Sequence, residues 1–233
     1  MNADELTVRF AGLTTAHLAD GCIRAGVPVR CAPAGTRAVV PEWRVAGRVC
    51  PARHVGSVDV FLEAFETAAP GDVLVVDNGG RLDESCVGDL VVLEAQAAGL
   101  AGIVVWGLHR DTADIQSIGL PVFSLGSVPT GPLSLTDRPE DALSTASVGV
   151  WSVSRDDVVF GDSDGVLLVP GACADEVVLL AERIRDTEQG QAESIRGGRS
   201  LRSQLQFSAY LAGRGGGVTF REHLRRVGGA VEE

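Results

Sequence analysis

The chain has 233 residues, of which 45% are hydrophobic and 22% charged, so it can bury the core of one large domain. Its net charge of −11 repels phosphate backbones and argues against a nucleic-acid-binding role. All 20 basic residues are Arg, so no side-chain amine exists for a Schiff base, for pyridoxal phosphate or for a phosphate-binding loop. Cleavage of a carbon–carbon bond would therefore need a metal ion as electron sink.

The first part of the chain is predicted to form a helix, a strand and a second helix. Thr14 or Thr15 is a favourable N-cap for a helix that runs through Ile23 and ends near Gly26. The next predicted elements are a strand at 43–54 and a helix at 58–67.

The middle of the chain alternates strand-like apolar runs with helical segments over short connections. Strands are predicted at 72–77, 102–106 and 120–125, and helices at 88–98 and 111–118. This βαβαβ order is typical of a parallel sheet covered by helices.

After a turn-rich stretch, the chain is predicted to return to short antiparallel strands and then to helices. The strands are expected near 148–153, 157–160 and 165–169, and the helices at about 172–187 and 199–212. No strand precedes the glycine cluster at 213–217, so it is interpreted as a loop and not as a dinucleotide-binding fingerprint. The last residues, with the amphipathic segment FREHLRR, either cross onto a neighbouring subunit or form a free terminus.

The cysteines and histidines give no sign of a zinc site or a disulfide scaffold. The five cysteines and four histidines are widely separated, and no C-x-x-C pair occurs. The first residues, MNADELTVRF, lack the basic and apolar regions of a signal peptide, and no apolar run reaches about 18 residues. We therefore expect a soluble cytoplasmic protein with neither membrane nor nucleic acid as partner.

One segment has the G-x-S-x-G spacing of a hydrolase nucleophile, at 161–165. A nucleophile elbow needs a helix after the serine, but VLLVP follows here and predicts a strand. We therefore expect Ser163 to lie in a hairpin turn. Asp162 and Asp164 are expected to form that turn, with metal binding as the alternative.

Two loops follow the strands at 72–77 and 102–106, so both would emerge at the carboxyl edge of a parallel sheet, where ligands usually bind. The first ends in Gly88-Asp89-Leu90-Val91 and opens a helix, whose free backbone N–H groups can hold a carboxylate or an enolate oxygen. The second carries Arg110, a bidentate partner for a carboxylate, and Asp111, an oxygen ligand for Mg²⁺.

Each of these residues also has a purely structural interpretation. Asp89 and Asp111 suit a helix cap or a first helical turn, and Arg110 suits an ordinary surface ion pair. The convergence of an anion clamp, a helix terminus and two carboxylates favours a functional site. His109 adjoins this site and either carries protons or serves packing and hydrogen bonding, since its side chain should diverge from those of its neighbours.

At these residues the chain resembles the RraA-like family, which includes 4-hydroxy-4-methyl-2-oxoglutarate aldolases, oxaloacetate decarboxylases and a regulator of ribonuclease E activity. The resemblance rests on Asp89 followed, after twenty residues, by Arg110-Asp111. It is supported by PGDVLVVDNGG (70–80), GLPVFSLG (119–126) and GDSDGVLLVP (161–170), and it covers about residues 12–200.

The resemblance implies an α/β fold, a layered β/β/α swivelling-type single domain with flanking N- and C-terminal helices. It places the RraA-like domain at 1–200 and a helical extension at 201–233. The extension is a candidate to pack on a neighbouring subunit. It also implies homotrimers or homohexamers with active sites between subunits.

The family roles carry over to matching positions. Arg110 would bind the pyruvyl carboxylate together with the backbone of Gly88, Leu90 and Val91. Asp111 would hold Mg²⁺, or Mn²⁺ or Co²⁺, largely through water, and Asp89 would orient a water for proton transfer. Glu188 of an adjacent subunit, or else Glu193, would approach the metal. Trp106 and His109 depart from the family pattern, so they could reshape the pocket.

These features together predict a class II, metal-dependent carbon–carbon lyase for a small 2-oxo acid. Retro-aldol cleavage of a 4-hydroxy-2-oxo acid and decarboxylation of oxaloacetate would both leave a pyruvate enolate, stabilised by the ion, by Arg110 and by the helix N-terminus. The alternative is a non-catalytic oligomeric regulator that binds and inhibits a ribonuclease or another protein through an acidic surface.

Overall fold

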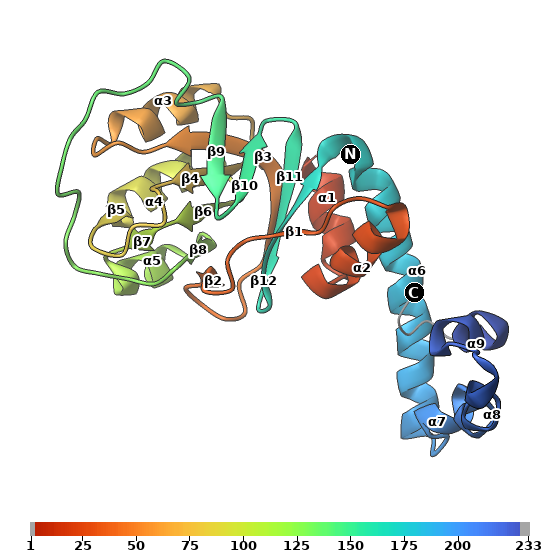
Figure 1. Cartoon of the computed structure of the whole chain (residues 1–233). Helices are drawn as coiled ribbons and strands as arrows, with labels where there is room; N and C mark the ends of the chain where they lie inside the picture. Colours follow the sequence, from red (N-terminus) through yellow and green to blue (C-terminus); the bar gives the residue numbers. More distant parts are fainter. Residues whose placement is uncertain (1–2, 229–233) are drawn as a thin grey trace.

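One curled, eight-stranded sheet organises the computed structural model, which describes residues 3–228 (Figure 1). In spatial order its strands are β1 (Arg30–Cys31), β12 (Gly165–Pro170), β11 (Asp157–Asp162), β3 (Val45–Arg53), β4 (Val73–Asp77), β6 (Gly102–Trp106), β8 (Val122–Ser124) and β2 (Arg37–Ala38). The α/β class and the flanking helices expected from the sequence are confirmed.

The strands β3, β4, β6 and β8 are parallel, as the βαβαβ order predicts. The helices that accompany them are α3 (Asp59–Thr67), α4 (Asp89–Ala97) and α5 (Thr112–Ile118). Every residue of β4 is buried, because helices cover one face of the sheet and the β9–β10 hairpin packs near the other. All four parallel strands therefore end at one edge of the sheet.

The expected antiparallel meander is correct for two of its three strands. β11 pairs with β12 and also with β3, which joins the antiparallel half of the sheet to the parallel half. The strand expected at 148–153 is wrong. This region forms a separate hairpin of β9 (Thr145–Val148) and β10 (Trp151–Ser154), because Gly149 turns the chain at a φ of 64°.

The G-x-S-x-G segment is a hairpin turn, as predicted. Asp162 pairs with Gly165 across the turn, so Ser163 and Asp164 form its tip. Asp162 also has a function that the sequence did not reveal. Its carboxylate accepts hydrogen bonds of 2.7 Å from the backbone N–H and from the hydroxyl of Thr15, and thereby fixes the start of a helix.

That helix is α2 (Thr15–Ala25), whose N-cap is Thr14, one of the two predicted candidates, and which ends near the predicted Gly26, a left-handed C-cap. It packs with α1 (Ala3–Phe10) and the long α6 (Ala174–Arg196) on the antiparallel half of the sheet (Figure 1). The helix α1 was not predicted. The 3-10 turn η1 (Gly171–Cys173) leads from β12 into α6.

The C-terminal helices gather at the far end of α6, away from the sheet (Figure 1). They are α7 (Leu201–Gln204), α8 (Phe207–Gly213), the 3-10 turn η2 (Arg214–Gly216) and α9 (Phe220–Val227). The single helix expected at 199–212 is divided, because Gln206 has a φ of 48°. The FREHLRR segment forms α9, whose His223 lies 2.7 Å from the carbonyl oxygen of Leu205. The expected 201–233 extension ends outside the described residues.

None of the helices between residues 3 and 228 has the length and apolarity that a bilayer crossing requires.

Candidate functional site

Two short strands that the sequence analysis missed bring the candidate loops together. β5 (Ser85–Val87) and β7 (Leu108–His109) pair in parallel, beyond the ends of β4 and β6. The backbone N–H of Arg110 donates to the carbonyl oxygen of Val87 at 2.9 Å. Gly88 and Arg110, each directly after one of these strands, are therefore neighbours.

Asp111 has an unusual backbone conformation and a carboxylate that does not cap its helix. Its φ of 58° and ψ of 40° lie in the left-handed region, which a residue with a side chain rarely adopts. Oδ2 lies 3.4 Å from the backbone nitrogen of Asp89 and 3.3 Å from Nε of Arg110. Asp111 is thus the N-cap residue of α5 by position, as its structural interpretation predicts, but its carboxylate accepts from the first residue of α4 and not from its own helix.

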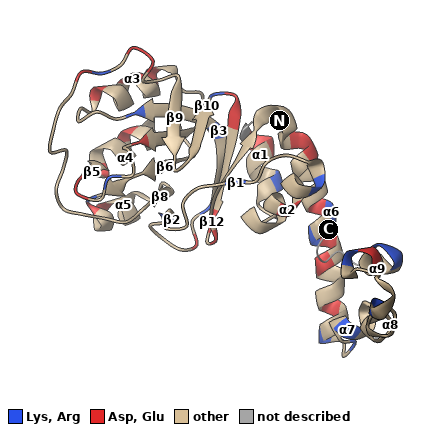
Figure 2. Ribbon diagram, viewed as in Figure 1, with Lys and Arg blue, Asp and Glu red and all other residues tan. Residues whose placement is uncertain are grey.

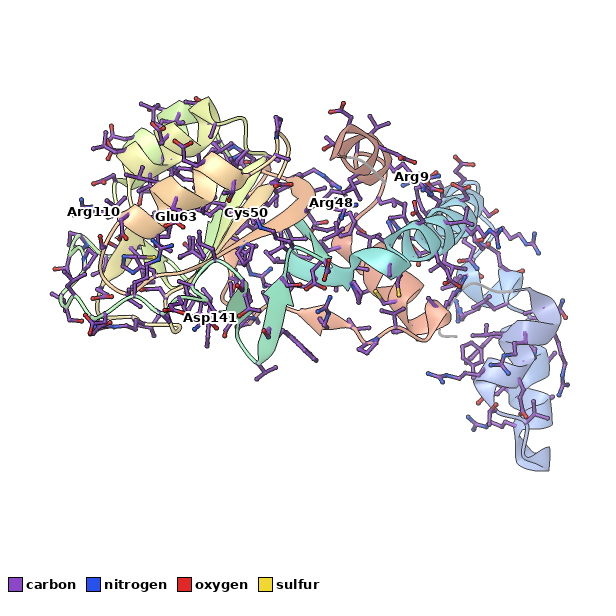
Figure 3. All side chains as sticks on the ribbon, turned by 90° about the horizontal axis from the view of Figure 1, so that it is seen from above. Arg9, Arg48, Cys50, Glu63, Arg110 and Asp141 are labelled. Atoms are coloured by element: carbon purple, nitrogen blue, oxygen red, sulfur yellow. The ribbon has the colours of Figure 1, made fainter. Side chains whose placement is uncertain are left out.

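Most N–H groups of the Arg110 guanidinium have no partner among the described residues and can donate to a ligand. Its side chain is 47% exposed, and only Nε is near an acidic group. The two terminal nitrogens have no hydrogen-bond partner among residues 3–228, so they can grip a carboxylate as a fork. In Figure 3 Arg110 lies at the end of the molecule opposite the C-terminal helices.

The N-terminus of α4 supplies further donors beside Arg110. The first N–H groups of a helix have no partner within the helix, and those of Leu90 and Val91 find none elsewhere in the described structure. The side chain of Asp89 is half-buried in the same first turn. This terminus therefore presents positive partial charge next to the guanidinium of Arg110.

A cavity of about 460 Å³ lies between these groups. Its lining combines polar groups, from Arg110 and the Gly88–Val91 segment, with the apolar side chains of Val58, Cys86 and Pro132. Burial raises the pKa of the Cys86 thiol far above its usual range, so this cysteine stays neutral. Arg110 also borders a smaller hollow of about 280 Å³, which Asp111 lines.

His54 is a cavity residue that the sequence analysis did not single out. It directly follows β3, at the same edge of the sheet, and is only 7% exposed. Its Nδ1 lies 2.8 Å from Oδ1 of Asn78, and its ring stacks on Phe61. Burial lowers the pKa of His54, so the imidazole is neutral. Its place at the end of a predicted strand was the signal that could have revealed it.

His109 and Trp106 do not line this cavity. His109 is buried, with Nδ1 at 2.7 Å from the hydroxyl of Ser124 and Nε2 at 3.0 Å from that of Thr112. Burial lowers its pKa as well. Of the two interpretations of His109, packing and hydrogen bonding is therefore the one that the contacts support. Trp106 packs beneath Gly80.

The two glutamates considered for the metal lie on α6, at the opposite end of the molecule from α4 and α5 (Figure 1). Glu188 pairs with His17 at 3.1 Å, and Glu193 is exposed. Neither meets Asp111 within one chain. Their role depends on a neighbouring subunit and stays a prediction.

The acidic groups near Arg110 suit only a loosely held ion. Within residues 3–228 no three His, Cys, Asp or Glu side chains gather in a form that could enclose a metal. One carboxylate, that of Asp111, lies beside the guanidinium, and only its Oδ2 contacts the N-terminus of α4. Magnesium commonly binds through one or two carboxylates, with water and substrate oxygens completing its shell, so this donor set fits a largely hydrated Mg²⁺.

The fold and the cavity define an α/β protein with a cavity, lined by an arginine and a helix N-terminus, at the carboxyl edge of its parallel strands. Within that class the chain belongs to the RraA-like (Aldolase/RraA) family, whose model matches residues 15–168.

Relatives support the same assignment. A protein of Halalkalibacterium halodurans, provisionally named 4-hydroxy-4-methyl-2-oxoglutarate aldolase, is 30% identical over 151 residues, which are 63% of this chain and 71% of that protein. Across the curated relatives the match spans from 22% to 84% of the relative's length. The relationship therefore concerns the α/β core.

Solved structures agree with the fold. An uncharacterized protein from Pseudomonas syringae is 26% identical with a TM-score of 0.73, covering 86% of this chain and 96% of that one. Streptomyces coelicolor RraAS2, described as an unusual member of the RNase ES inhibitor RraA family, is 26% identical with a TM-score of 0.66, covering 82% and 97%. The family thus includes proteins named as aldolases and proteins named as inhibitors.

Proposed function

We propose that the chain is a divalent-metal-dependent lyase that cleaves a small 2-oxo acid between C3 and C4. The reactions would be retro-aldol cleavage of a 4-hydroxy-2-oxo acid, decarboxylation of oxaloacetate, or both, through a pyruvate enolate. The observation that carries this proposal is the contact of the Asp111 carboxylate with both Arg110 and the N-terminus of α4, at the point where these two border the cavity.

Binding would begin at the carboxylate of the substrate. The free terminal nitrogens of Arg110 would grip it, and the N–H groups of Leu90 and Val91 would donate to the oxygens on which negative charge develops. These donors are fixed before the substrate arrives, so little reorganisation is needed as the charge grows. Asp89 would hold the water that gives a proton to C3 of the enolate.

Asp111 would hold Mg²⁺, with Mn²⁺ or Co²⁺ as substitutes, mainly through water. When bound, such an ion supplies a Lewis acid that draws charge away from the breaking bond. The absence of lysine supports this, because no side-chain amine exists to form an imine.

A pyruvate-release assay tests the proposal. We expect release from oxaloacetate or from 4-hydroxy-4-methyl-2-oxoglutarate, loss of activity with chelator, and recovery with Mg²⁺ or Mn²⁺. Arg110→Ala should lower kcat/KM at least a hundredfold, whereas Arg155→Ala on the turn between β10 and β11 should leave it unchanged. Full activity after thorough chelation, or in Arg110→Ala, would refute the scheme.

We also propose a homotrimer or homohexamer. An apolar groove of about 370 Å³ between α3 and α4 adjoins the cavity, and Leu62, Leu90 and Leu93 on it are 49%, 74% and 50% exposed. An apolar patch of this kind is typical of a surface that another subunit covers.

The second candidate function is inhibition of a ribonuclease or another enzyme by a non-catalytic oligomer. It is supported by the likeness to RraAS2 and by acidic residues along α3 and α6, while α7 and α9 carry arginines (Figure 2). Pull-down with a purified ribonuclease, beside the pyruvate assay, distinguishes the two functions. An Arg110→Ala variant that still inhibits would favour this candidate.

A further inference from the structure

The imidazole of His54 is held in one orientation at the wall of the cavity. Its backbone N–H donates to the carbonyl oxygen of Asp77 at 2.9 Å, and its ring lies nearly parallel to that of the fully buried Phe61, with centroids 5.3 Å apart. The side chain of Asn78 fixes the Nδ1 edge at 2.8 Å. A ring held on one face and at one nitrogen has one unpartnered polar atom left, Nε2, and His54 lines both the cavity and an adjoining hollow of about 210 Å³.

The partner at Nδ1 determines the protonation of the ring. Oδ1 of Asn78 can only accept a hydrogen bond, so Nδ1 carries the proton and donates it. Nε2 of a neutral imidazole is then a lone-pair acceptor, and it has no hydrogen-bond partner among residues 3–228. Nδ2 of Asn78 is also buried without a partner, so this pair is not part of a closed structural network.

His54 shares its cavity with Arg110, the residue proposed to bind the substrate carboxylate. His54 and Arg110 line the same cavity, which the apolar residues Val58 and Pro132 complete. If Arg110 holds the C1 carboxylate, the C4 end of a short 2-oxo acid lies elsewhere in the same cavity, which His54 also lines. His54 is the one histidine among the described residues that line that cavity. Its imidazole is therefore the group in the lining that is suited to accept a proton near neutral pH.

We propose that His54 is the general base of retro-aldol cleavage, accepting at Nε2 the proton of the C4 hydroxyl group. This inference rests on the proposed lyase function and adds the residue that acts on the hydroxyl group. As Nε2 takes the proton, the O–H electron pair forms the C4 carbonyl and the C3–C4 electron pair moves into the pyruvate enolate. C3 then receives a proton from water, and the imidazolium returns its proton to solvent.

Decarboxylation of oxaloacetate provides an internal reference. It leaves the same enolate, but the leaving group is CO₂ and no hydroxyl proton is removed. Arg110 and the N-terminus of α4 would serve both reactions, whereas His54 would serve only the retro-aldol reaction. A residue that merely supported the fold would affect both reactions alike.

The experiment compares the two reactions in His54→Gln, with His223→Gln in the C-terminal helices as the matched control. We expect kcat for 4-hydroxy-4-methyl-2-oxoglutarate to fall about a hundredfold or more in His54→Gln, because general bases contribute about that much. Oxaloacetate decarboxylation should stay within about threefold of the wild type, and His223→Gln should retain both reactions.

Equal losses in both reactions, or unchanged retro-aldol cleavage in His54→Gln, would overturn the inference and leave the lyase proposal intact. A wild-type protein that decarboxylates oxaloacetate but does not cleave the hydroxy acid would have the same effect. Inactivity of the wild type on both substrates would refute the lyase proposal itself.

The wild-type pH profile provides a second test that needs no variant. The groups acting on His54 are Glu84, Asp59 and Arg81, together with its hydrogen bond to Asn78. Retro-aldol cleavage should lose activity at acid pH as Nε2 becomes protonated, and decarboxylation should lack this limb. The same acid limb in both reactions would contradict the assignment.

Discussion

Gly88 and the carboxylate of Asp111 are so close that a β-carbon at position 88 would lie 2.5 Å from Oδ2. The same β-carbon would lie 3.2 Å from Nε of Arg110. The carboxylate and the guanidinium can therefore take these positions only because residue 88, at the start of α4, is a glycine.

Gly88→Ala should displace this carboxylate and lower kcat/KM for pyruvate release at least a hundredfold. Overpacking here acts on side-chain ends, so we expect a loss of only about 1 kcal/mol in the free energy of unfolding. Gly190→Ala is the control, because no atom lies within 4 Å of a β-carbon there and a helical alanine should add about 0.5–1 kcal/mol. Wild-type activity in Gly88→Ala would contradict the model of the site.

Asp111→Gly should increase stability while abolishing turnover. Glycine accommodates the φ of 58° without strain, which should add up to about 1 kcal/mol to the free energy of unfolding in urea. Asp111→Asn should raise the Mg²⁺ concentration for half-maximal activity at least tenfold, whereas Asp114→Asn on the exposed side of α5 should not. Equal metal requirements in the two Asn variants would count against Asp111 as the metal ligand.

Leu93→Asp should dissociate the oligomer, because it places a charge in the apolar groove between α3 and α4. Light scattering after size exclusion measures the mass, and the matched control is Val150→Asp, at a position 90% exposed on the β9–β10 turn. A monomeric wild type, or an unchanged mass in Leu93→Asp, would show that this groove is not a subunit interface.

Asp162→Ala should destabilise the protein by about 2 kcal/mol, because the buried N–H and hydroxyl group of Thr15 lose a charged acceptor. Ser163→Ala, at the exposed tip of the same turn, should change neither stability nor pyruvate release. Chemical denaturation measures the first effect. A loss of activity in Ser163→Ala would revive the nucleophile interpretation of the G-x-S-x-G segment.

Stability should decrease as the pH falls below about 6.5, the ordinary pKa of histidine. Burial lowers the pKa of His54 and of His109 in the folded state, so the unfolded chain binds more protons in this range. The stabilising contribution is thus complete above the unfolded pKa and is lost as the pH falls toward the folded values. Urea titrations between pH 7.5 and 5.5 should show this slope, reduced in His109→Gln.

Local chemistry made most of the fold predictable. The caps of α2, the apolar runs of β4 and β6 and the turn at Ser163 depend on neighbouring residues, so the sequence pattern reveals them directly. The divided helix at Gln206 and the separate β9–β10 hairpin were missed, because single left-handed residues interrupt otherwise regular patterns.

The amino-acid sequence alone placed Gly88, Arg110 and Asp111 in loops at one sheet edge, since parallel strands end together. Only the tertiary structure decided that β5 pairs with β7, that Asp111 turns its carboxylate toward α4, and that His54 lines the same cavity. These relationships join segments twenty or more residues apart through contacts that have no sequence period, so no local pattern could reveal them.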